Sequence, residues 1–367
     1  MTDRVVNFSA GPGVLPLPVL ERARDELVSL PDVGASPLEV SHRGAWFTDV
    51  IQEAEANLRS LLAIADSHRV LFLQGGASMQ FSMVAANLLR DQGRCADYVV
   101  TGAWGEKARK EAERAGRVRV AWSGKDEGFT RVPDTDELLE AVDRAPAYVH
   151  VTTNETIQGV EYPDTPIVPD DAVLVADGSS DFLSRPEDVA RYGVLYAGAQ
   201  KNAGPAGLTL AIVRDDVLAR VPEGLPTVLD YRTYAEHGSL YNTPPVFSIY
   251  VFLLVTRWLR DEVGGLDAMH ERNRDKAERL YRVLDDLPAF YRGHAAPGSR
   301  SLMNVTFRLP SEELERSFVT EAAAEGMVEL KGHRSVGGIR ASIYNAMPAD
   351  GVERLAAFMR SFADANA

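Results

Sequence analysis

The stretch Val70-Leu71-Phe72-Leu73-Gln74-Gly75-Gly76-Ala77-Ser78 decides the fold class of this chain. Its apolar first half predicts a buried strand, and the glycines after it predict a tight turn into a helix that begins near Met79. Strands that alternate with helices in this way are typical of a mostly parallel sheet that is covered on both faces. The stretch therefore indicates an α/β protein.

The same alternation continues to about residue 213. Seven apolar runs predict strands, and the segments between them with helical periodicity predict helices. The predicted strands are Val70–Gln74, Tyr98–Thr101, Val118–Trp122, Tyr148–Thr152, Val173–Ala176, Val194–Tyr196 and Leu208–Val213, and the clearest helices are Ser78–Leu89, Glu106–Ala115 and Asp134–Arg144. We therefore expect one seven-stranded, mostly parallel sheet.

A second architecture begins after a segment with several Pro and Gly residues, 222–245. Helical periodicity returns there, and strand, helix, strand and helix patterns follow up to residue 365. We expect a large domain of residues 17–258 and a smaller α+β domain made of residues 1–16 and 259–367. A chain of 367 residues is long enough for two such cores.

Composition excludes several classes of protein. The chain is 45% hydrophobic and 25% charged, as an ordinary globular protein is, and its net charge of −14 disfavours a nucleic-acid partner. A single cysteine, Cys95, allows no intramolecular disulfide and suits a reducing compartment. The longest uncharged apolar stretch, Val246–Thr256, is too short to span a bilayer, and the first residues do not resemble a signal peptide. We therefore expect a cytoplasmic protein without a membrane partner.

Three groups along the predicted sheet have the properties that a phosphorylated aldehyde cofactor needs. Residues 75–78 form a turn into a helix, where backbone N–H groups and the helix dipole attract a phosphate. Asp177 ends a strand, where a carboxylate can pair with a ring nitrogen. Lys201 follows another strand among small residues, where burial lowers the pKa of an amine and makes it nucleophilic.

Each group has a plainer interpretation when it is taken alone. The glycine turn can be only a turn, Asp177 can be a helix cap, and Lys201 can be a solvated surface charge. A phosphate site, a partner for a ring nitrogen and an amine that follow in this order on one sheet are, however, what pyridoxal phosphate requires. The sequence therefore predicts an enzyme that uses pyridoxal phosphate.

Cationic side chains gather in two parts of this acidic chain. Residues 330–349 contain no acidic residue, and the cations of interest are Lys331, His333, Arg334 and Arg340 there and His42 and Arg43 near the N-terminus. Guanidinium groups that converge on one cleft select a substrate with two anionic groups. A solvated basic face is the alternative, but a solvated helix would not use Gly332, Gly337 and Gly338.

Two other kinds of catalytic site lack support. His42, His150 and Asp177 do not have the spacing of a metal-ligand motif, so we expect no metal. The chain also has no G-x-S-x-G sequence, which a serine hydrolase of the α/β type would carry.

Five motifs together resemble the phosphoserine aminotransferases, which are class-V aminotransferases. They match in the same order from about residue 5 to the C-terminus, and they are Asn7-Phe8-Ser9-Ala10-Gly11-Pro12, Glu39-Val40-Ser41-His42-Arg43-Gly44, Ala197-Gly198-Ala199-Gln200-Lys201-Asn202, Asn242-Thr243-Pro244-Pro245 and Gly332-His333-Arg334. The resemblance implies the fold type I architecture of pyridoxal phosphate enzymes and a homodimer with active sites at the subunit interface.

The resemblance also implies an activity. The family transfers an amino group between glutamate and 3-phosphohydroxypyruvate and gives phosphoserine and 2-oxoglutarate, a step of serine biosynthesis. The related 4-phosphohydroxythreonine substrate of pyridoxine biosynthesis stays open. Aminotransferases that act on glyoxylate or pyruvate need only one carboxylate clamp, so the number of cations favours a phosphorylated oxo acid.

Individual residues receive roles from the same resemblance. Lys201 would carry the cofactor and Asp177 would pair with its ring nitrogen. Trp104 would stack on the ring, and Thr156 would bind its phenolic oxygen. The phosphate would be held by Ala77, Ser78 and Gln200 and, from the neighbouring subunit, by Asn242 and Thr243, while the substrate-binding cations would be His42, Arg43, His333, Arg334 and Arg340.

Two alternatives belong to other classes of protein. A cysteine desulfurase shares the fold but needs a cysteine on a mobile loop, whereas Cys95 lies just before a predicted strand. A binding protein that has kept the fold without catalysis is the other alternative, and bound cofactor seen in the visible spectrum would distinguish the two.

Overall fold

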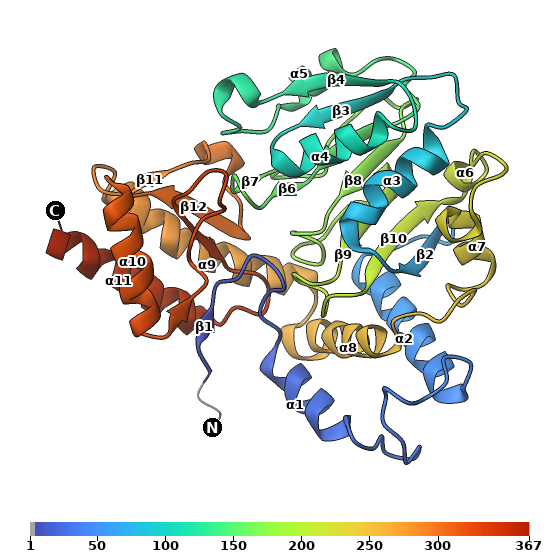
Figure 1. Cartoon of the computed structure of the whole chain (residues 1–367), viewed down its shortest axis with the longest axis horizontal. Coiled ribbons are helices and arrows are strands. Elements are labelled where there is room, and N and C mark those ends of the chain that lie inside the picture. The colour runs from blue at the N-terminus through green and yellow to red at the C-terminus, as the bar shows by residue number, and fades with distance from the viewer. Residues whose placement is uncertain (1–3, 367) are drawn as a thin grey trace.

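The seven predicted strands form one sheet in the larger lobe of the computed structural model, which describes residues 4–366 (Figure 1). The strand order is β2-β10-β9-β8-β5-β3-β4, and only β10 runs antiparallel to its neighbours. The strands are β2 (His68–Leu73), β3 (Ala96–Val100), β4 (Val118–Ser123), β5 (Val149–Thr152), β8 (Leu174–Asp177), β9 (Tyr192–Gly198) and β10 (Thr209–Arg214). The predicted α/β class and mostly parallel sheet are therefore confirmed.

Alternate side chains of the central strands enter two different hydrophobic cores, as the two-residue period of a strand requires. In β2, Val70 and Phe72 belong to one core, and Leu71 and Leu73 belong to the other. The first core is covered by α1 (Leu17–Glu26), α2 (Ala45–Leu61) and α8 (Val246–Arg257), and the second by α3 (Gly76–Leu88), α4 (Ala103–Ala112) and α7 (Tyr231–Glu236). Two further helices, α5 (Thr135–Ala141) and α6 (Asp215–Leu218), lie in connecting segments.

The smaller lobe has a core of its own. Its antiparallel sheet consists of β11 (Arg292–Gly293), β12 (Asn304–Arg308) and β14 (Ile339–Ser342), and its helices are α9 (Leu266–Asp286), α10 (Glu312–Ala324) and α11 (Ala349–Asn366). The start of the chain joins this lobe, because β1 (Val6–Asn7) pairs with β13 (Met327–Val328) and Phe8 is buried in the same core. The smaller α+β part of the predicted fold is therefore present (Figure 1).

Helix α9 contributes to both lobes, because its first residues pack in the core of one and its later residues pack in the core of the other. Met269 still packs in a core of the larger lobe, whereas Ala277 packs in the core of the smaller lobe. A π-helical turn, Trp258–Val263, joins α8 to this helix. Domain limits at residues 17 and 258 remain a proposal.

Sequence patterns failed to indicate the shortest elements. The strands β1, β11 and β13, and the hairpin of β6 (Asn154–Glu155) and β7 (Val160–Glu161), are two residues long, which is too short to show a period. The helix predicted from Glu106 begins three residues earlier, at Ala103, for a reason that lies in the site described below. Within residues 4–366, no helix combines the length and apolar character that a membrane crossing needs.

Candidate active site

The carboxyl edge of the sheet opens into a cavity of about 270 Å³. Strands β5 and β8, the turns that follow β2 and β9, and the small-lobe strand β14 all contribute to its wall. The predicted site residues that line it are Ala77, Ser78, Trp104, Thr156, Asp177, Gln200, Lys201, His333 and Arg340. Side chains that are far apart in the sequence therefore meet at one place, as the predicted chemistry requires.

Lys201 lies in the turn after β9, with its amine in the cavity. The turn is fixed on both sides, since Gly13 N donates to Gln200 O at 2.7 Å and Asn345 N donates to the side-chain oxygen of Asn202 at 2.9 Å. Burial lowers the pKa of the Lys201 amine, and the carboxylates of Asp177 and Glu155 oppose that shift. This is the environment that makes a lysine amine nucleophilic.

Asp177 ends β8, and its side chain is buried beside the same cavity. One carboxylate oxygen, Oδ1, accepts hydrogen bonds from Ser179 N at 3.0 Å and from Ser179 Oγ at 2.6 Å. Ser179 Oγ in turn accepts from Gly198 N at 3.0 Å, which ties the end of β8 to the end of β9. Burial raises the pKa of Asp177, so a cation placed against its second oxygen would stabilise the carboxylate.

Trp104 is held in the cavity wall through three hydrogen bonds. Its backbone N–H and that of Gly105 donate to the carboxylate of Glu155 at 2.9 and 2.7 Å, and its indole Nε1 donates to Thr156 Oγ1 at 2.9 Å. The carboxylate satisfies N–H groups in the first turn of α4, which explains why this helix starts earlier than its sequence pattern indicates. The hydroxyl hydrogen of Thr156 remains available to a ligand.

The turn before α3 has the features of a phosphate site. Gly75 and Gly76 have φ values of 89° and 66°, and no heavy atom lies within 4 Å of the place where a Cβ of Gly76 would be. The N-cap residue, Gly75, has no side chain to cap this helix, and Gly76 N already donates to Thr209 Oγ1 at 2.7 Å. The N–H groups of Ala77 and Ser78 are therefore the ones that can bind an anion. Ala77 and Ser78 follow directly and line the cavity.

Two of the predicted cations reach the cavity from the smaller lobe. Arg340, on β14, is partly buried, and one of its terminal nitrogens donates to Thr156 O at 3.4 Å. Burial lowers the pKa of His333, and the neighbouring positive charges of Arg340, Lys107 and Arg334 lower it further. These positive charges repel one another in the free protein. An anion bound among them would relieve that repulsion.

The remaining predicted residues do not line this cavity. Arg334 is exposed beside His333 and lines a neighbouring groove. His42, Arg43, Asn242 and Thr243 lie outside the cavity, and two buried atoms among them, His42 Nε2 and Asn242 Oδ1, have no hydrogen-bond partner among the described residues. The chain by itself therefore brings together only part of the predicted site.

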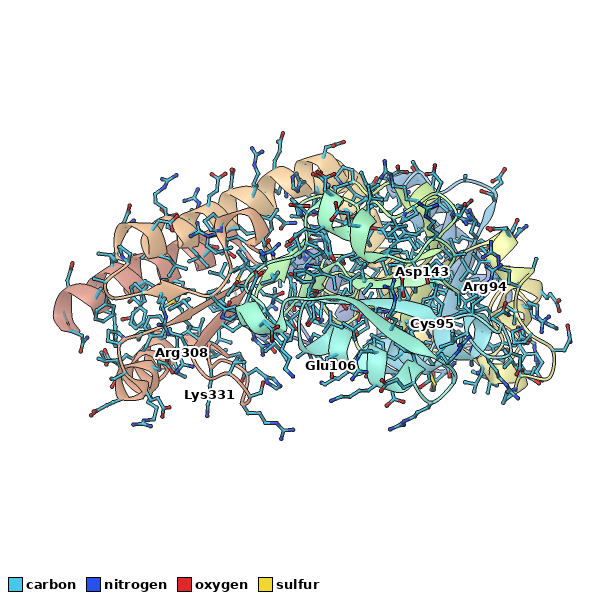
Figure 2. The ribbon with its side chains drawn as sticks, turned by 90° about the horizontal axis from the view of Figure 1, so that it is seen from above. Arg94, Cys95, Glu106, Asp143, Arg308 and Lys331 are labelled. Atoms are coloured by element: carbon cyan, nitrogen blue, oxygen red, sulfur yellow. The ribbon has the colours of Figure 1, made fainter. Side chains whose placement is uncertain are left out.

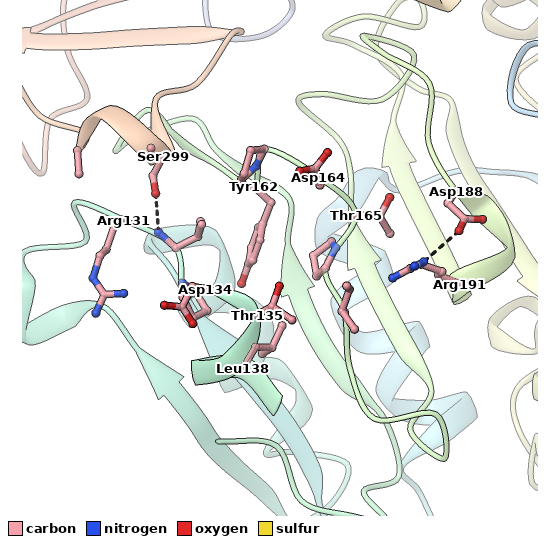
Figure 3. Close-up of a pocket in the computed structure, with 17 residues that line it drawn as sticks. Arg131, Asp134, Thr135, Leu138, Tyr162, Asp164, Thr165, Asp188, Arg191 and Ser299 are labelled. Atoms are coloured by element: carbon pink, nitrogen blue, oxygen red, sulfur yellow. Dashed lines mark hydrogen bonds and ion pairs between the residues drawn. The ribbon is translucent and has the colours of Figure 1, made fainter. Parts of the chain in front are cut away.

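A larger cavity of about 800 Å³ lies elsewhere, between the segments around residues 131–138 and 162–167 (Figure 3). Its two arginines are already paired, Arg131 with Glu127 and Glu137 and Arg191 with Asp188. It contains neither a lysine nor a cysteine. The smaller cavity at the sheet edge is therefore the candidate active site.

Comparison with known proteins agrees with this geometry. The family model for class-V aminotransferases matches residues 5–355. Phosphoserine aminotransferases from Rhodopirellula baltica and Geobacillus kaustophilus are 50% and 52% identical to the chain, with coverage of 99% and 98% of this chain and 96% and 98% of theirs. The chain belongs to the phosphoserine aminotransferases, within the class-V aminotransferase family.

Solved structures of the family have the same fold. The phosphoserine aminotransferase from Bacillus circulans subsp. alkalophilus superimposes with a TM-score of 0.95 at 48% identity and full coverage of both chains. The pyridoxal-phosphate-bound enzyme from Trichomonas vaginalis has a TM-score of 0.89 at 38% identity, with 97% of this chain and all of that chain covered. The fold type I expectation is therefore confirmed.

The residues of the cavity fit the cofactor of such an aminotransferase, pyridoxal phosphate. The uncapped start of α3 suits the phosphate, the second oxygen of Asp177 suits a protonated ring nitrogen, and Lys201 suits the aldehyde. Thr152 Oγ1 and Asn154 Oδ1 also lie in the wall, and neither buried atom has a hydrogen-bond partner within residues 4–366. Unsatisfied polar atoms of this kind are expected where a polar ligand binds.

Sequence reasoning missed several residues of the site. Glu155 and Ser179 hold Trp104 and Asp177 in place, and Ala10 and Gly11 line the cavity. Ser179 follows Asp177 by two residues, a spacing that is typical of a side-chain-to-backbone turn and could have indicated the contact. Nothing local in the sequence connects Glu155 to Trp104, which lies 51 residues away.

We predict that Glu155 makes stability depend on pH in the cofactor-free protein. Burial raises its pKa from an ordinary value of 4.5 to about 7. Between these values the folded chain keeps a proton that the unfolded chain has lost, so the free energy of unfolding falls as the pH rises through this window. The total loss is about 3 kcal/mol.

Glu155→Gln cannot ionise and should lack this contribution. Urea denaturation of both proteins at several pH values between about 5 and about 8 measures the difference. The stability of the wild type relative to the variant should fall across this range and level off above it. A difference that is independent of pH would contradict the assignment.

Proposed function

We propose that the chain transfers the amino group between L-glutamate and 3-phosphohydroxypyruvate, giving O-phospho-L-serine and 2-oxoglutarate. The observation that carries this proposal is the meeting of Lys201 and Asp177 with unpaired cations in one cavity. Both amino donors carry an α-carboxylate and a second anion, which matches a site with several cations. This activity is consistent with a role in serine biosynthesis, and 4-phosphohydroxythreonine remains the second candidate substrate.

When it is bound, pyridoxal phosphate supplies an aldehyde that condenses with amines and a ring that accepts electrons. Lys201 would hold the cofactor through its amine, and the same amine would move the proton at the substrate Cα. Asp177 would keep a proton on the ring nitrogen, and Trp104 would exclude water from the ring. Thr156 would donate its hydroxyl hydrogen to the phenolic oxygen.

The substrate anions are divided between two groups of cations in this proposal. Arg340 binds the α-carboxylate, because it is the guanidinium that reaches the cavity wall beside Thr156. His333 and Arg334 bind the distal phosphate or γ-carboxylate together with His42 and Arg43. Because the latter pair lies away from the cavity of its own chain, we propose that it is contributed by a second subunit in a homodimer, as are Asn242 and Thr243.

A single-turnover reaction tests the proposal most directly. The holoenzyme is mixed with O-phosphoserine in the absence of an acceptor, and the phosphorylated oxo acid is quantified. We expect one equivalent per active site, because the amino group stays on the cofactor until 2-oxoglutarate arrives. Conversion of alanine at the same rate would contradict the preference for a phosphorylated substrate, and the absence of any product would favour a non-catalytic protein.

We predict that Lys201→Ala loses both the cofactor linkage and proton transfer. Loss of a catalytic base alone lowers turnover by roughly 10²- to 10⁴-fold. Borohydride reduction followed by peptide mass spectrometry should find the cofactor attached to Lys201 in the wild type and unattached in the variant. Cofactor that is still fixed covalently to the variant would show that another amine has this role.

We predict that Asp177→Asn keeps most of its cofactor but turns over more slowly. The amide preserves the shape of the side chain and removes the negative charge that holds a proton on the ring nitrogen. Loss of one preorganised electrostatic contact costs roughly 10²-fold in kcat. Steady-state kinetics and the measured cofactor content separate slow chemistry from poor binding, and wild-type turnover would exclude the proposed role.

We predict that Arg334→Lys and Arg43→Lys selectively impair substrates with two anions. Lysine keeps the charge but loses the planar pair of donors that matches a phosphate or carboxylate. A charge-assisted hydrogen bond contributes roughly 1.5–3 kcal/mol, so kcat/KM for phosphoserine and glutamate should fall by about 10- to 150-fold. The slow reaction with alanine is the internal control, and an equal loss there would place these residues in the fold or at the α-carboxylate.

A further inference from the structure

Asn345 is buried in the segment that follows β14, and none of the roles above uses its side chain. Its side-chain Nδ2 donates to Leu183 O at 2.8 Å, and its Oδ1 accepts from Asn273 Nδ2 at 2.8 Å. Its backbone N–H donates to Asn202 Oδ1 at 2.9 Å. One residue is therefore hydrogen-bonded to α9 and to two segments of the larger lobe.

The two segments that Asn345 contacts in the larger lobe are those that carry the amine and the carboxylate of the site. Asn202 directly follows the active-site lysine, and Leu183 lies in the segment that leaves β8 after Asp177. These two segments also contact each other, since Asn202 Nδ2 donates to Ser180 O at 3.2 Å. Hydrogen bonds thus join three segments in a closed triangle, and Asn345 makes both connections of its own segment.

The backbone of Leu183 depends on these contacts. Its φ of 60° lies in the left-handed region, which residues other than glycine rarely adopt and which persists only where the surroundings hold it. Asn345 binds the carbonyl oxygen of Leu183. Asn273 Nδ2 donates to the next carbonyl oxygen, that of Ser184, at 3.0 Å. Two buried asparagines therefore hold the bend in the segment that follows Asp177.

The segment that contains Asn345 is itself anchored. The buried ammonium of Lys276, on α9, donates to Ile343 O and Tyr344 O at 3.0 and 2.7 Å. Tyr344 Oη donates at 2.7 Å to the carbonyl oxygen of Ala10, which lines the cavity. Figure 2 shows α9 reaching from one lobe to the other along one edge of the molecule. The segment is therefore fixed to a helix that both lobes share.

We propose that Asn345 is a positioning residue for amino-group transfer, which keeps the Lys201 amine and the Asp177 carboxylate at a fixed separation by holding the segments that carry them. Movement of a proton at the substrate Cα requires an amine within reach while the ring nitrogen keeps its partner. A misplacement of about 1 Å can cost roughly 100-fold in rate. This inference rests on the proposed function, because it takes the roles of Lys201 and Asp177 from there.

Asn345→Ala in the holoenzyme tests the proposal, and Asn87→Ala is the matched control. Asn87 is also buried, its Nδ2 donates to Leu229 O and its Oδ1 accepts from Tyr231 N, but none of these three residues lines the cavity. We expect kcat of Asn345→Ala to fall roughly 10- to 100-fold, with phosphoserine and with the slow substrate alanine alike, while KM changes little. The reason is that the lost contacts act on the reacting groups and not on the substrate anions. Asn87→Ala should lose stability and keep the kcat of the wild type.

The cofactor-free protein provides a readout that does not depend on activity. Burial lowers the pKa of the Lys201 amine, so a loosened turn should let this pKa rise toward that of an ordinary lysine. Reductive methylation at several pH values, followed at Lys201 by peptide mass spectrometry, measures it. The midpoint should move upward in Asn345→Ala and stay in place in Asn87→Ala.

Asn273→Ala keeps the test decisive if Asn345→Ala does not fold. It removes the donors to Asn345 Oδ1 and Ser184 O and leaves Asn345 itself unchanged. Both kcat and the labelling midpoint should change in the same direction as in Asn345→Ala, by a smaller amount. Wild-type values of both in a folded variant, a loss confined to KM, or a loss confined to phosphoserine would overturn the proposal.

Lys201→Ala separates failure of this inference from failure of the proposed function. If Lys201→Ala loses the attached cofactor and turnover while Asn345→Ala behaves like Asn87→Ala, only the role of Asn345 is wrong. If Lys201→Ala still holds the cofactor covalently, the assignment of the amine is wrong, and the positioning role of Asn345 is wrong with it.

Discussion

Adjacent parallel strands place the Asp177 carboxylate and the Lys201 amine at the same buried edge of the sheet, and the rest of the site depends on that placement. β8 and β9 are paired in parallel, with Asp177 opposite Tyr196, so both strands end at the same edge of the sheet. Ser179 then connects Asp177 to Gly198 at the end of β9. Burial disfavours the charged form of both groups, since it lowers the pKa of Lys201 and raises that of Asp177.

Glu155 extends this arrangement to the aromatic wall of the site. Its buried carboxylate accepts the first N–H groups of α4, which fixes Trp104 and the start of the helix together. Gly102 precedes that helix because a Cβ there would lie 2.5 Å from the Glu155 side chain. A single buried acid therefore positions both the Trp104 side of the cavity wall and the first turn of α4.

The smaller lobe contributes charge to a site that the larger lobe builds. Arg340 arrives on β14, and the segment directly after that strand returns to the lysine turn through the hydrogen bond from Asn345 N to Asn202. The buried ammonium of Lys276 donates to the carbonyl oxygens of Ile343 and Tyr344 at 3.0 and 2.7 Å and so fixes the same segment. The position of Arg340 and the position of Lys201 are therefore linked through a few buried polar contacts.

The sequence by itself determined the α/β class and the seven strands and indicated Asp177 and Lys201 as candidate site residues, because apolar periodicity and the turn residues after a strand are local properties. The sequence also indicated the cations near Arg340, because residues 330–349 contain no acidic residue. Tertiary structure alone decided which of them reach the cavity, since Arg334 and His333 are neighbours in sequence and only His333 lines it. It also decided the role of Glu155, whose contacts arise where α4 packs beside the β6 hairpin, and no local pattern carries the distance between two segments that meet only in the folded chain.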